Sequence, residues 1–333
     1  MGRVLLGREM RPTFEPETVH RELEIIKDDL HCSAVKIQGQ DVDRLLKAGE
    51  DALRLGMDVW LAPELFEKSH EETFDYTVKC AAEAETLRQR WAGRVTLSIG
   101  TELTLFMQGI IPGNDLMARL GNPAFLQGVR SGAFQKPLND FLGRTNQAVR
   151  EVFHGPVTYA SVSQVETVDW SIFDYVCVDL YRDKMNRDTY GDAVKRYTAY
   201  GKPVVIGEFG CCTFRGAEDM GGMGWNIVDW AKMPPELKGD YVYDQGVQAR
   251  ELAEELRILD GAGVDGAFVF TFVQPAPEGK EVLEMAKLIK FDPDITSYSL
   301  VKSFMDRHGT TYPDMKWEPK ESFRAVADYY ANR

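Results

Sequence analysis

The chain has 333 residues, of which 44% are hydrophobic and 11% aromatic, and it carries a formal net charge of −13. An apolar content of this size supports a folded core and excludes a disordered chain. The acidic balance argues against nucleic acid or an anionic membrane as a partner, because both need clustered positive charge.

The N-terminal residues and the cysteines indicate where the protein works. The first apolar run is too short for a signal peptide, and no window approaches the roughly 18 apolar residues that span a bilayer. The five cysteines are scattered and odd in number, which is not typical of a disulfide framework. We therefore expect a cytoplasmic protein, in which Cys211 and Cys212 either pack in the core or line a site.

Short β-favouring runs alternate with helical patterns along the chain. The predicted strands cover residues 3–7, 33–39, 57–63, 94–102, 155–161, 173–181, 201–210 and 266–272. The predicted helices cover residues 16–30, 71–91, 190–200, 243–259 and 323–330, with two more that begin at residue 41 and end near residue 153.

This alternation predicts the architecture. A doubly wound sheet would also alternate, but eight such units favour one closed (β/α)₈ TIM barrel, with residues 1–333 as a single domain. Long loops follow the fourth, seventh and eighth predicted strands, and the first of them is an irregular stretch over residues 103–127. No phosphate-binding glycine motif follows the first strand, so we predict no cofactor.

Two glutamates end predicted strands. Glu102 closes the fourth strand and Glu208 the seventh. Strand alternation would place Glu102 on the face of Ser98 and Gly100, and both acids would then project at the mouth of the barrel. Either acid alone could equally pair with a lysine or arginine. Two acids facing each other across a cleft suit glycoside hydrolysis, in which one is protonated and the other ionised.

The strand pattern resembles the large (β/α)₈ clan of retaining glycoside hydrolases that includes the family-five cellulases and β-mannanases. Its most specific match is Lys-Pro-Val-Val-Ile-Gly-Glu-Phe-Gly at residues 202–210, which is similar to the clan's nucleophile strand. The resemblance runs in order over roughly residues 3–275. It implies that Glu208 is the nucleophile, that Glu102 is the acid/base, and that Tyr181 hydrogen-bonds the nucleophile.

Four positions depart from the pattern of family five. Thr101 stands where those enzymes have asparagine, and Asp179 stands where they have histidine. Lys36 replaces an arginine, which keeps the positive charge but loses the bidentate fork. Phe270 replaces the tryptophan platform of the eighth strand. We expect all four to contact substrate, in a divergent family of the clan to which cellulose or mannan is not carried over as the substrate.

Further substrate contacts are expected at the ends of other strands. Glu64 follows the third strand and binds either a sugar hydroxyl or a neighbouring cation, while Gln38 and Arg8 follow the second and first strands. Trp225 lies in a glycine-rich segment after the seventh strand and could stack on a sugar face. The five histidines show no paired ligand spacing, so we predict no metal.

The sequence thus predicts a retaining glycosidase that acts by double displacement on a small glycoside or oligosaccharide. Its two carboxyl groups should lie about 5–5.5 Å apart, against about 6.5–9.5 Å in an inverting enzyme. The alternatives are a transglycosidase that uses the same two acids, and a barrel that binds carbohydrate without catalysis. The expected partner is the carbohydrate substrate, and aromatic residues in the C-terminal tail leave room for a homodimer.

Overall fold

The computed structural model describes residues 4–5, 8–9, 11–276, 278, 284 and 286–332. These residues belong to two compact units, each assembled from separate stretches of the chain. The first unit comprises Met1–Leu23, Ser33–Asp179 and Thr198–Gly207, and the second comprises Glu24–Cys32, Leu180–Tyr197 and Glu208–Arg333. The prediction of a single domain stays a prediction.

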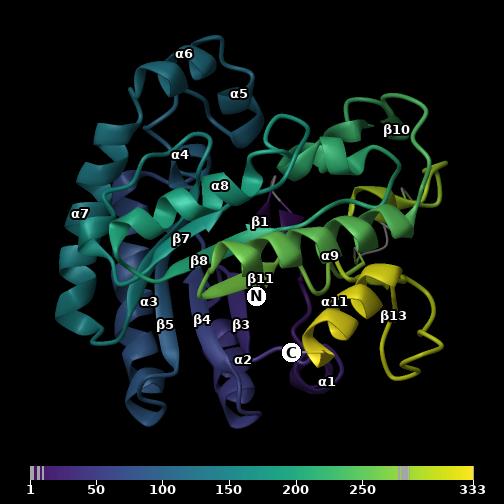
Figure 1. Cartoon of the computed structure of the whole chain (residues 1–333), viewed down its shortest axis with the longest axis horizontal. Coiled ribbons are helices and arrows are strands. Elements are labelled where there is room, and N and C mark those ends of the chain that lie inside the picture. Colours follow the sequence, from purple (N-terminus) through teal and green to yellow (C-terminus); the bar gives the residue numbers. More distant parts are fainter. Residues whose placement is uncertain are drawn as a thin grey trace. The chain divides into compact units, whose positions relative to one another are not determined.

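The main sheet has seven strands in the order β11-β8-β7-β6-β5-β4-β3 (Figure 1). The strands are β3 (Ala34–Gly39), β4 (Asp58–Pro63), β5 (Val95–Thr101), β6 (Val157–Val162), β7 (Val176–Asp179), β8 (Val204–Phe209) and β11 (Gly266–Val269). Neighbours from β3 to β7 pair in parallel. Every residue of β5 and β8 is buried, which is typical of parallel strands covered on both faces.

Helices between the strands cover the sheet of the first unit. They are α2 (Val42–Arg54), α3 (His70–Arg90) and α7 (Gln135–Val152), while α1 (Pro16–Asp28) precedes the sheet. α2 packs on β3 and β4, and α3 packs on β5 and beside α7. Asp41 caps α2, and Ser69 and Glu72 form a reciprocal capping box on α3, so both helix starts follow from local sequence.

The second unit holds the C-terminal elements. Its helices are α8 (Tyr190–Lys195), α9 (Gln245–Ala262) and α11 (Glu321–Ala331), with 3₁₀ turns at Ala217–Asp219, Gly221–Ile227 and Pro293–Thr296. A further 3₁₀ turn, Arg196–Tyr200, follows α8 and continues into a stretch of the first unit. Two small antiparallel sheets pair β9 (Val228–Asp229) with β10 (Glu236–Leu237) and β12 (Val301–Ser303) with β13 (Trp317–Pro319). α9 packs against both α8 and α11 (Figure 1).

The first predicted strand is wrong as a member of the main sheet. β1 (Val4–Leu5) instead pairs antiparallel with β2 (Arg8–Glu9), in a separate two-stranded sheet. Pairing with a segment only a few residues away closes a very short loop, which costs little chain entropy. The short apolar segment β1 therefore pairs with the neighbouring β2 and not with a strand of the main sheet.

The stretch after β5 is also more ordered than predicted. It contains three short helices, α4 (Leu103–Phe106), α5 (Leu116–Leu120) and α6 (Ala124–Ser131). Arg119, fully buried, holds this stretch together: its guanidinium donates to the carbonyls of Leu105 (2.6 Å) and Gly113 (3.0 Å) and to the Glu67 carboxylate. This buried cation thus links the backbone of α4 and of the following loop to Glu67, beside apolar side chains that are themselves buried.

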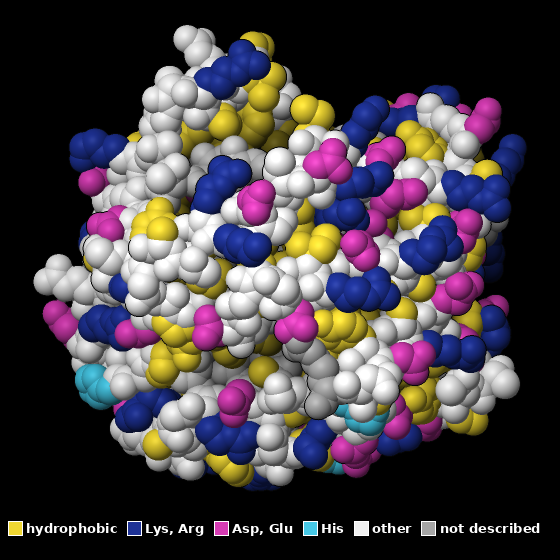
Figure 2. Space-filling view, viewed as in Figure 1, with side chains coloured by type: hydrophobic (Ala, Val, Ile, Leu, Met, Phe, Trp, Pro, Cys, Tyr) yellow, Lys and Arg dark blue, Asp and Glu magenta, His cyan; other side chains and the backbone are white. Residues whose placement is uncertain are grey.

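The surface is mixed in charge. On the face drawn in Figure 2, acidic and basic side chains are interspersed, and hydrophobic side chains gather near α5. Met117 on α5 is 46% exposed and Leu126 on α6 is 63% exposed. No helix among the described residues is long and apolar enough to cross a membrane.

Candidate active site

Glu102 lies directly after β5, in the first unit. Its backbone N–H donates to the carbonyl of Ala160 on β6 at 2.8 Å, so the sheet still holds this residue. It then begins helix α4 as the N-cap, with φ 46° and ψ 42°, and its side chain makes no capping hydrogen bond. The left-handed region is uncommon for a side chain other than glycine, asparagine or aspartate, and it marks positions that the surrounding structure constrains.

The alternation argument does not set the direction of Glu102. The register between β5 and β6 shifts between Ser98 and Thr101, and Gly100 takes φ 148°. An irregularity of this kind interrupts the two-residue period of the strand and re-aims the residues after it. A Cβ at Gly100 would lie 2.8 Å from the Leu103 side chain, so the irregularity needs glycine here.

Lys36 and Asp179 form a buried ion pair in the first unit. The Lys36 Nζ lies 3.8 Å from Asp179 Oδ1, and the two side chains are 5% and 0% exposed. Nζ also donates to the carbonyl oxygen of Gly207 at 3.2 Å. A Cβ at Gly207 would lie only 2.5 Å from Asp179 Oδ1, so the Asp179 carboxyl group can lie this close to β8 only because residue 207 is glycine. This pair therefore holds the peptide group that directly precedes Glu208.

Other predicted contacts of the first unit lie at neighbouring strand ends. Glu64 follows β4, is 3% exposed, and donates its N–H to the carbonyl of Gly39 at 2.9 Å. Gln38 is half-buried on β3 and pairs in register with Ala62. Thr101 is 2% exposed at the end of β5. The β3, β4 and β5 residues thus share the carboxyl edge of the sheet, whereas the Arg8 side chain lies outside the described part of the chain.

Glu208 and Tyr181 are brought together in the second unit. The Tyr181 hydroxyl donates to Glu208 Oε2 at 3.0 Å, and the Leu180 N–H donates to the carbonyl of Glu208 at 2.9 Å. Glu208 is 6% exposed, at the carboxyl end of β8. The hydrogen bond implied by the sequence resemblance is thus present, while the catalytic roles of the two residues stay predictions.

A buried network that the sequence did not reveal fixes the segment around Tyr181. Tyr190 donates to the Leu180 carbonyl at 2.8 Å, and Glu255 Oε1 accepts from the Arg182 N–H at 3.3 Å. Arg182 also pairs with Glu251 at 2.7 Å. Burial raises the pKa of both glutamates. Their signal in the sequence is faint, because residues 251 and 255 are simply one turn apart on an ordinary helical pattern.

Aromatic side chains pack behind Tyr181. The ring of Tyr298 lies 5.7 Å from that of Tyr181 and 6.0 Å from that of Phe270, measured between centroids. Trp225 is half-buried and packs against the buried cluster that contains Tyr298, and its contact with a sugar stays a prediction. Cys211 and Cys212 are core members of the same cluster, which confirms the packing alternative for them.

The glycine-rich segment after β8 is closely packed. A Cβ at Gly222 would lie 3.1 Å from the Tyr181 ring, and one at Gly224 would lie 2.9 Å from Cys212 Sγ. The Tyr298 hydroxyl donates to the Gly221 carbonyl at 2.6 Å and accepts from the Gly224 N–H at 2.9 Å. Glycine at positions 222 and 224 therefore lets this segment pack directly against Tyr181 and Cys212.

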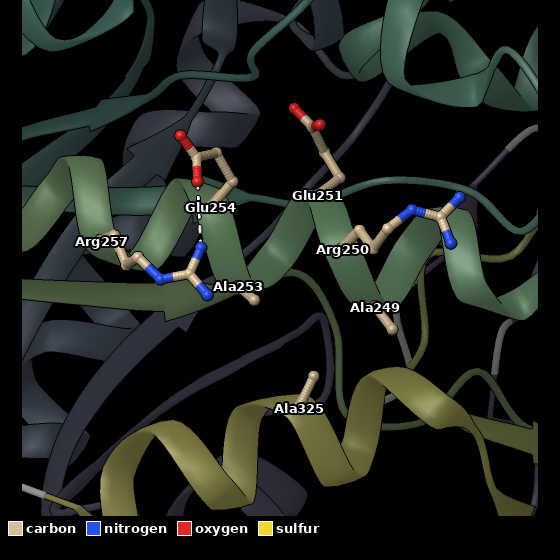
Figure 3. Close-up of a pocket in the computed structure, with 7 residues that line it drawn as sticks. All are labelled: Ala249, Arg250, Glu251, Ala253, Glu254, Arg257 and Ala325. Atoms are coloured by element: carbon tan, nitrogen blue, oxygen red, sulfur yellow. Dashed lines mark hydrogen bonds and ion pairs between the residues drawn. The ribbon is translucent and has the colours of Figure 1, made fainter.

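A separate hollow of about 560 Å³ opens between α9 and α11 (Figure 3). Its lining residues are Ala249, Arg250, Glu251, Ala253, Glu254, Arg257 and Ala325. Glu254 and Arg257 pair with each other at 3.0 Å. None of the predicted site residues lines it. Within the described ranges, no group of three or more histidine, cysteine or acidic residues could hold a metal ion.

Comparison with known proteins identifies the fold. No protein-family model and no curated protein matches the sequence. A GH113 β-1,4-mannanase structure matches with a TM-score of 0.61 at 15% identity, covering 95% of this chain and 94% of the mannanase. The GH113 β-mannanase of Alicyclobacillus acidocaldarius matches with a TM-score of 0.56 at 15% identity, covering 95% and 92%.

A glucuronidase matches as well, over part of its length. The β-glucuronidase of Bifidobacterium dentium gives a TM-score of 0.57 at 13% identity, covering 96% of this chain and 43% of the glucuronidase. These similarities confirm, at the level of the fold, the resemblance inferred from the sequence. The seven-stranded sheet and these similarities together show that the chain has a (β/α)₈ fold.

Proposed function

We propose that the protein is a retaining glycoside hydrolase that works by double displacement on a small glycoside or oligosaccharide. Glu208 is the nucleophile and Glu102 the acid/base. The observation that carries the proposal is the hydrogen bond of 3.0 Å from the Tyr181 hydroxyl to Glu208 Oε2, at the carboxyl end of β8. This strand end is where (β/α)₈ enzymes place their chemistry.

In the first step, a Glu208 oxygen attacks the anomeric carbon, and the bond from that carbon to the leaving oxygen breaks. Glu102 gives its proton to the leaving oxygen, so the aglycone departs as a neutral alcohol. In the second step, Glu102 takes a proton from water as the water attacks the same carbon, and Glu208 is released as a carboxylate. The anomeric configuration is retained because the carbon is inverted twice.

Neighbouring groups suit Glu208 to attack. The Tyr181 hydroxyl donates to Glu208 Oε2 and so helps to fix the orientation of this carboxyl group. The Lys36–Asp179 pair supports the same role indirectly, because Nζ holds the Gly207 carbonyl, next to Glu208 in the chain.

The substrate screen starts from the fold neighbours, which are β-1,4-mannanases and β-glucuronidases. Aryl β-mannosides and β-glucuronides are tested first, and other pyranosides and furanosides of both anomers are tested next. Proton NMR of the first-formed product then gives its anomeric configuration. Hydrolysis with inversion would refute the retaining mechanism, and the absence of turnover across the panel would refute the glycosidase assignment.

The nucleophile is tested by covalent trapping. A 2-deoxy-2-fluoro glycosyl fluoride of the preferred sugar should add one sugar mass, which peptide mapping should locate on Glu208. Glu208→Gln should lose both labelling and turnover. Glu254→Gln, which changes an exposed glutamate on α9, is the matched control and should retain them. Labelling of another carboxylate would overturn the role of Glu208. Product analysis at high acceptor concentration separates hydrolysis from transglycosylation.

A further inference from the structure

The first turn of helix α4 is capped by side chains from another part of the chain. The Leu103 N–H donates to the Tyr159 hydroxyl at 2.7 Å, and the Thr104 N–H donates to Glu166 Oε1 at 3.0 Å. Tyr159 in turn donates to the same Glu166 oxygen at 2.8 Å. Both N–H groups lack a partner within the helix, and the Thr104 N–H is one that an N-cap side chain can satisfy. The first turn of α4 is therefore capped without the carboxyl group of Glu102, although Glu102 is the N-cap residue.

Tyr159 and Glu166 form a buried and well-connected support. Tyr159, on β6, is 0% exposed, and Glu166, in the loop after that strand, is 7% exposed. The second Glu166 oxygen accepts from the Val162 N–H at 3.2 Å, so the carboxyl group has donors on both oxygens. Burial raises the pKa of Glu166, and the hydrogen bonds from Thr104 and Tyr159 act in the opposite direction. The Thr104 N–H, the Tyr159 hydroxyl and the Val162 N–H all donate to this carboxyl group, so hydrogen bonds hold both of its oxygens.

The hydrogen bonds to Tyr159 and Glu166 hold the backbone beside Glu102, a residue in a strained conformation. Glu102 has φ 46°, a conformation that costs on the order of 1–3 kcal/mol for an ordinary side chain and persists only where the surroundings impose it. The hydrogen bonds to Leu103 and Thr104 fix the backbone immediately after Glu102, and Arg119 fixes the Leu105 carbonyl at the far end of α4. Tyr159, Glu166 and Arg119, which lie outside β5, thus fix the backbone from which the Glu102 side chain projects.

We propose that Tyr159 and Glu166 are positioning residues for Glu102, which cap helix α4 in its place and hold its carboxyl group where it can protonate a leaving oxygen. This inference rests on the proposed function, because it assigns Glu102 the acid/base role. General acid catalysis depends on heavy-atom placement within hydrogen-bond reach, so a loosened α4 weakens proton transfer to the leaving group.

The test is a leaving-group series on the full-length enzyme. Phenyl, 4-nitrophenyl and 2,4-dinitrophenyl glycosides of the sugar that the wild type hydrolyses are compared for wild type, Tyr159→Phe, Glu166→Gln and Glu102→Ala. We expect Tyr159→Phe and Glu166→Gln to lower kcat/KM about 10- to 100-fold on the phenyl glycoside. We expect a change within about threefold on the dinitrophenyl glycoside, which departs without a proton. Glu102→Ala should show the same pattern with a larger amplitude.

A double variant distinguishes positioning from independent damage. Since Tyr159 acts through Glu102, adding Tyr159→Phe to Glu102→Ala should cause no further loss on the phenyl glycoside. Tyr312→Phe removes a hydrogen bond of 2.6 Å to Asp29 in the second unit and serves as the control, with activity unchanged. Hydrogen exchange of the Leu103 and Thr104 amides should also become faster in Tyr159→Phe, while that of the β5 amides stays slow.

The outcomes are separable. Equal losses on all three glycosides, or an equal further loss in the double variant, would show a merely structural role and overturn the inference. Unchanged kinetics and exchange in Tyr159→Phe would overturn it too. If Glu102→Ala itself shows no dependence on the leaving group, the acid/base assignment fails, and the positioning role fails with it.

Discussion

Substituting Lys36 by methionine should destabilise the protein, because it leaves the carboxyl group of Asp179 buried without its cation. The Asp179 side chain is 0% exposed and that of Lys36 is 5% exposed, so water cannot replace the lost ammonium group. Methionine has a similar length and fills the space, which leaves the electrostatic change as the main effect. Removing one partner of a buried pair typically costs about 3–5 kcal/mol, of which the lost hydrogen bond to the Gly207 carbonyl accounts for about 1 kcal/mol.

The double variant Lys36→Met/Asp179→Asn separates the two contributions. Neutralising Asp179 should restore about 2–4 kcal/mol, since the variant then no longer buries a carboxylate from which the Lys36 ammonium group has been removed, while the Gly207 carbonyl still lacks its donor. Lys79→Met is the control, because Lys79 is 70% exposed and its pair with Glu83 should contribute less than about 1 kcal/mol.

Urea unfolding is monitored by far-UV circular dichroism and by tryptophan fluorescence, and the free energies are compared where the two signals coincide. The reasoning is refuted if Lys36→Met changes the free energy of unfolding by less than about 1 kcal/mol, or if Asp179→Asn restores none of the loss.

Three further predictions concern the site and the fold around it. Tyr181→Phe removes the hydroxyl that donates to Glu208 and should lower kcat/KM about 10- to 100-fold, whereas an unchanged value would exclude a supporting role for Tyr181. Glu102→Gly should be more stable than Glu102→Ala by about 1 kcal/mol in thermal unfolding, because glycine accepts the positive φ of this position; equal stability would argue against strain there. Arg88 and the His154 N–H lower the pKa of Glu85 to about 2, below its unfolded value of about 4.3, so this pairing stabilises the fold above about pH 4.3 and is lost as the pH falls toward 2. Glu85→Gln should therefore cost more at pH 7 than near pH 3, where about half of this contribution is lost, and a cost independent of pH would contradict the assignment.

The sequence alone was sufficient for most of the architecture. The parallel strands from β3 to β8 and β11 lie within two or three residues of the predicted runs, because fully buried strands must be short, apolar and bounded by turns. The motif at residues 202–210 likewise predicted a buried strand that ends in Glu208. The contact from Tyr181 to Glu208 was predicted from the resemblance to the clan and not from any local sequence pattern.

Only the tertiary structure decided how the residues around the two acids are held. The ion pair of Lys36 with Asp179 and the cap from Tyr159 and Glu166 join residues from different strands and loops, which no local periodicity brings together. The register of β5 shifts after Ser98, and Glu102 has a positive φ. Strand alternation therefore does not predict the direction of the Glu102 side chain, because the conformation of an irregular strand end depends on the residues that pack against it. Local patterns follow from the chemistry of adjacent residues, whereas the direction of a side chain at a strand end depends on buried hydrogen bonds that form only when distant segments meet.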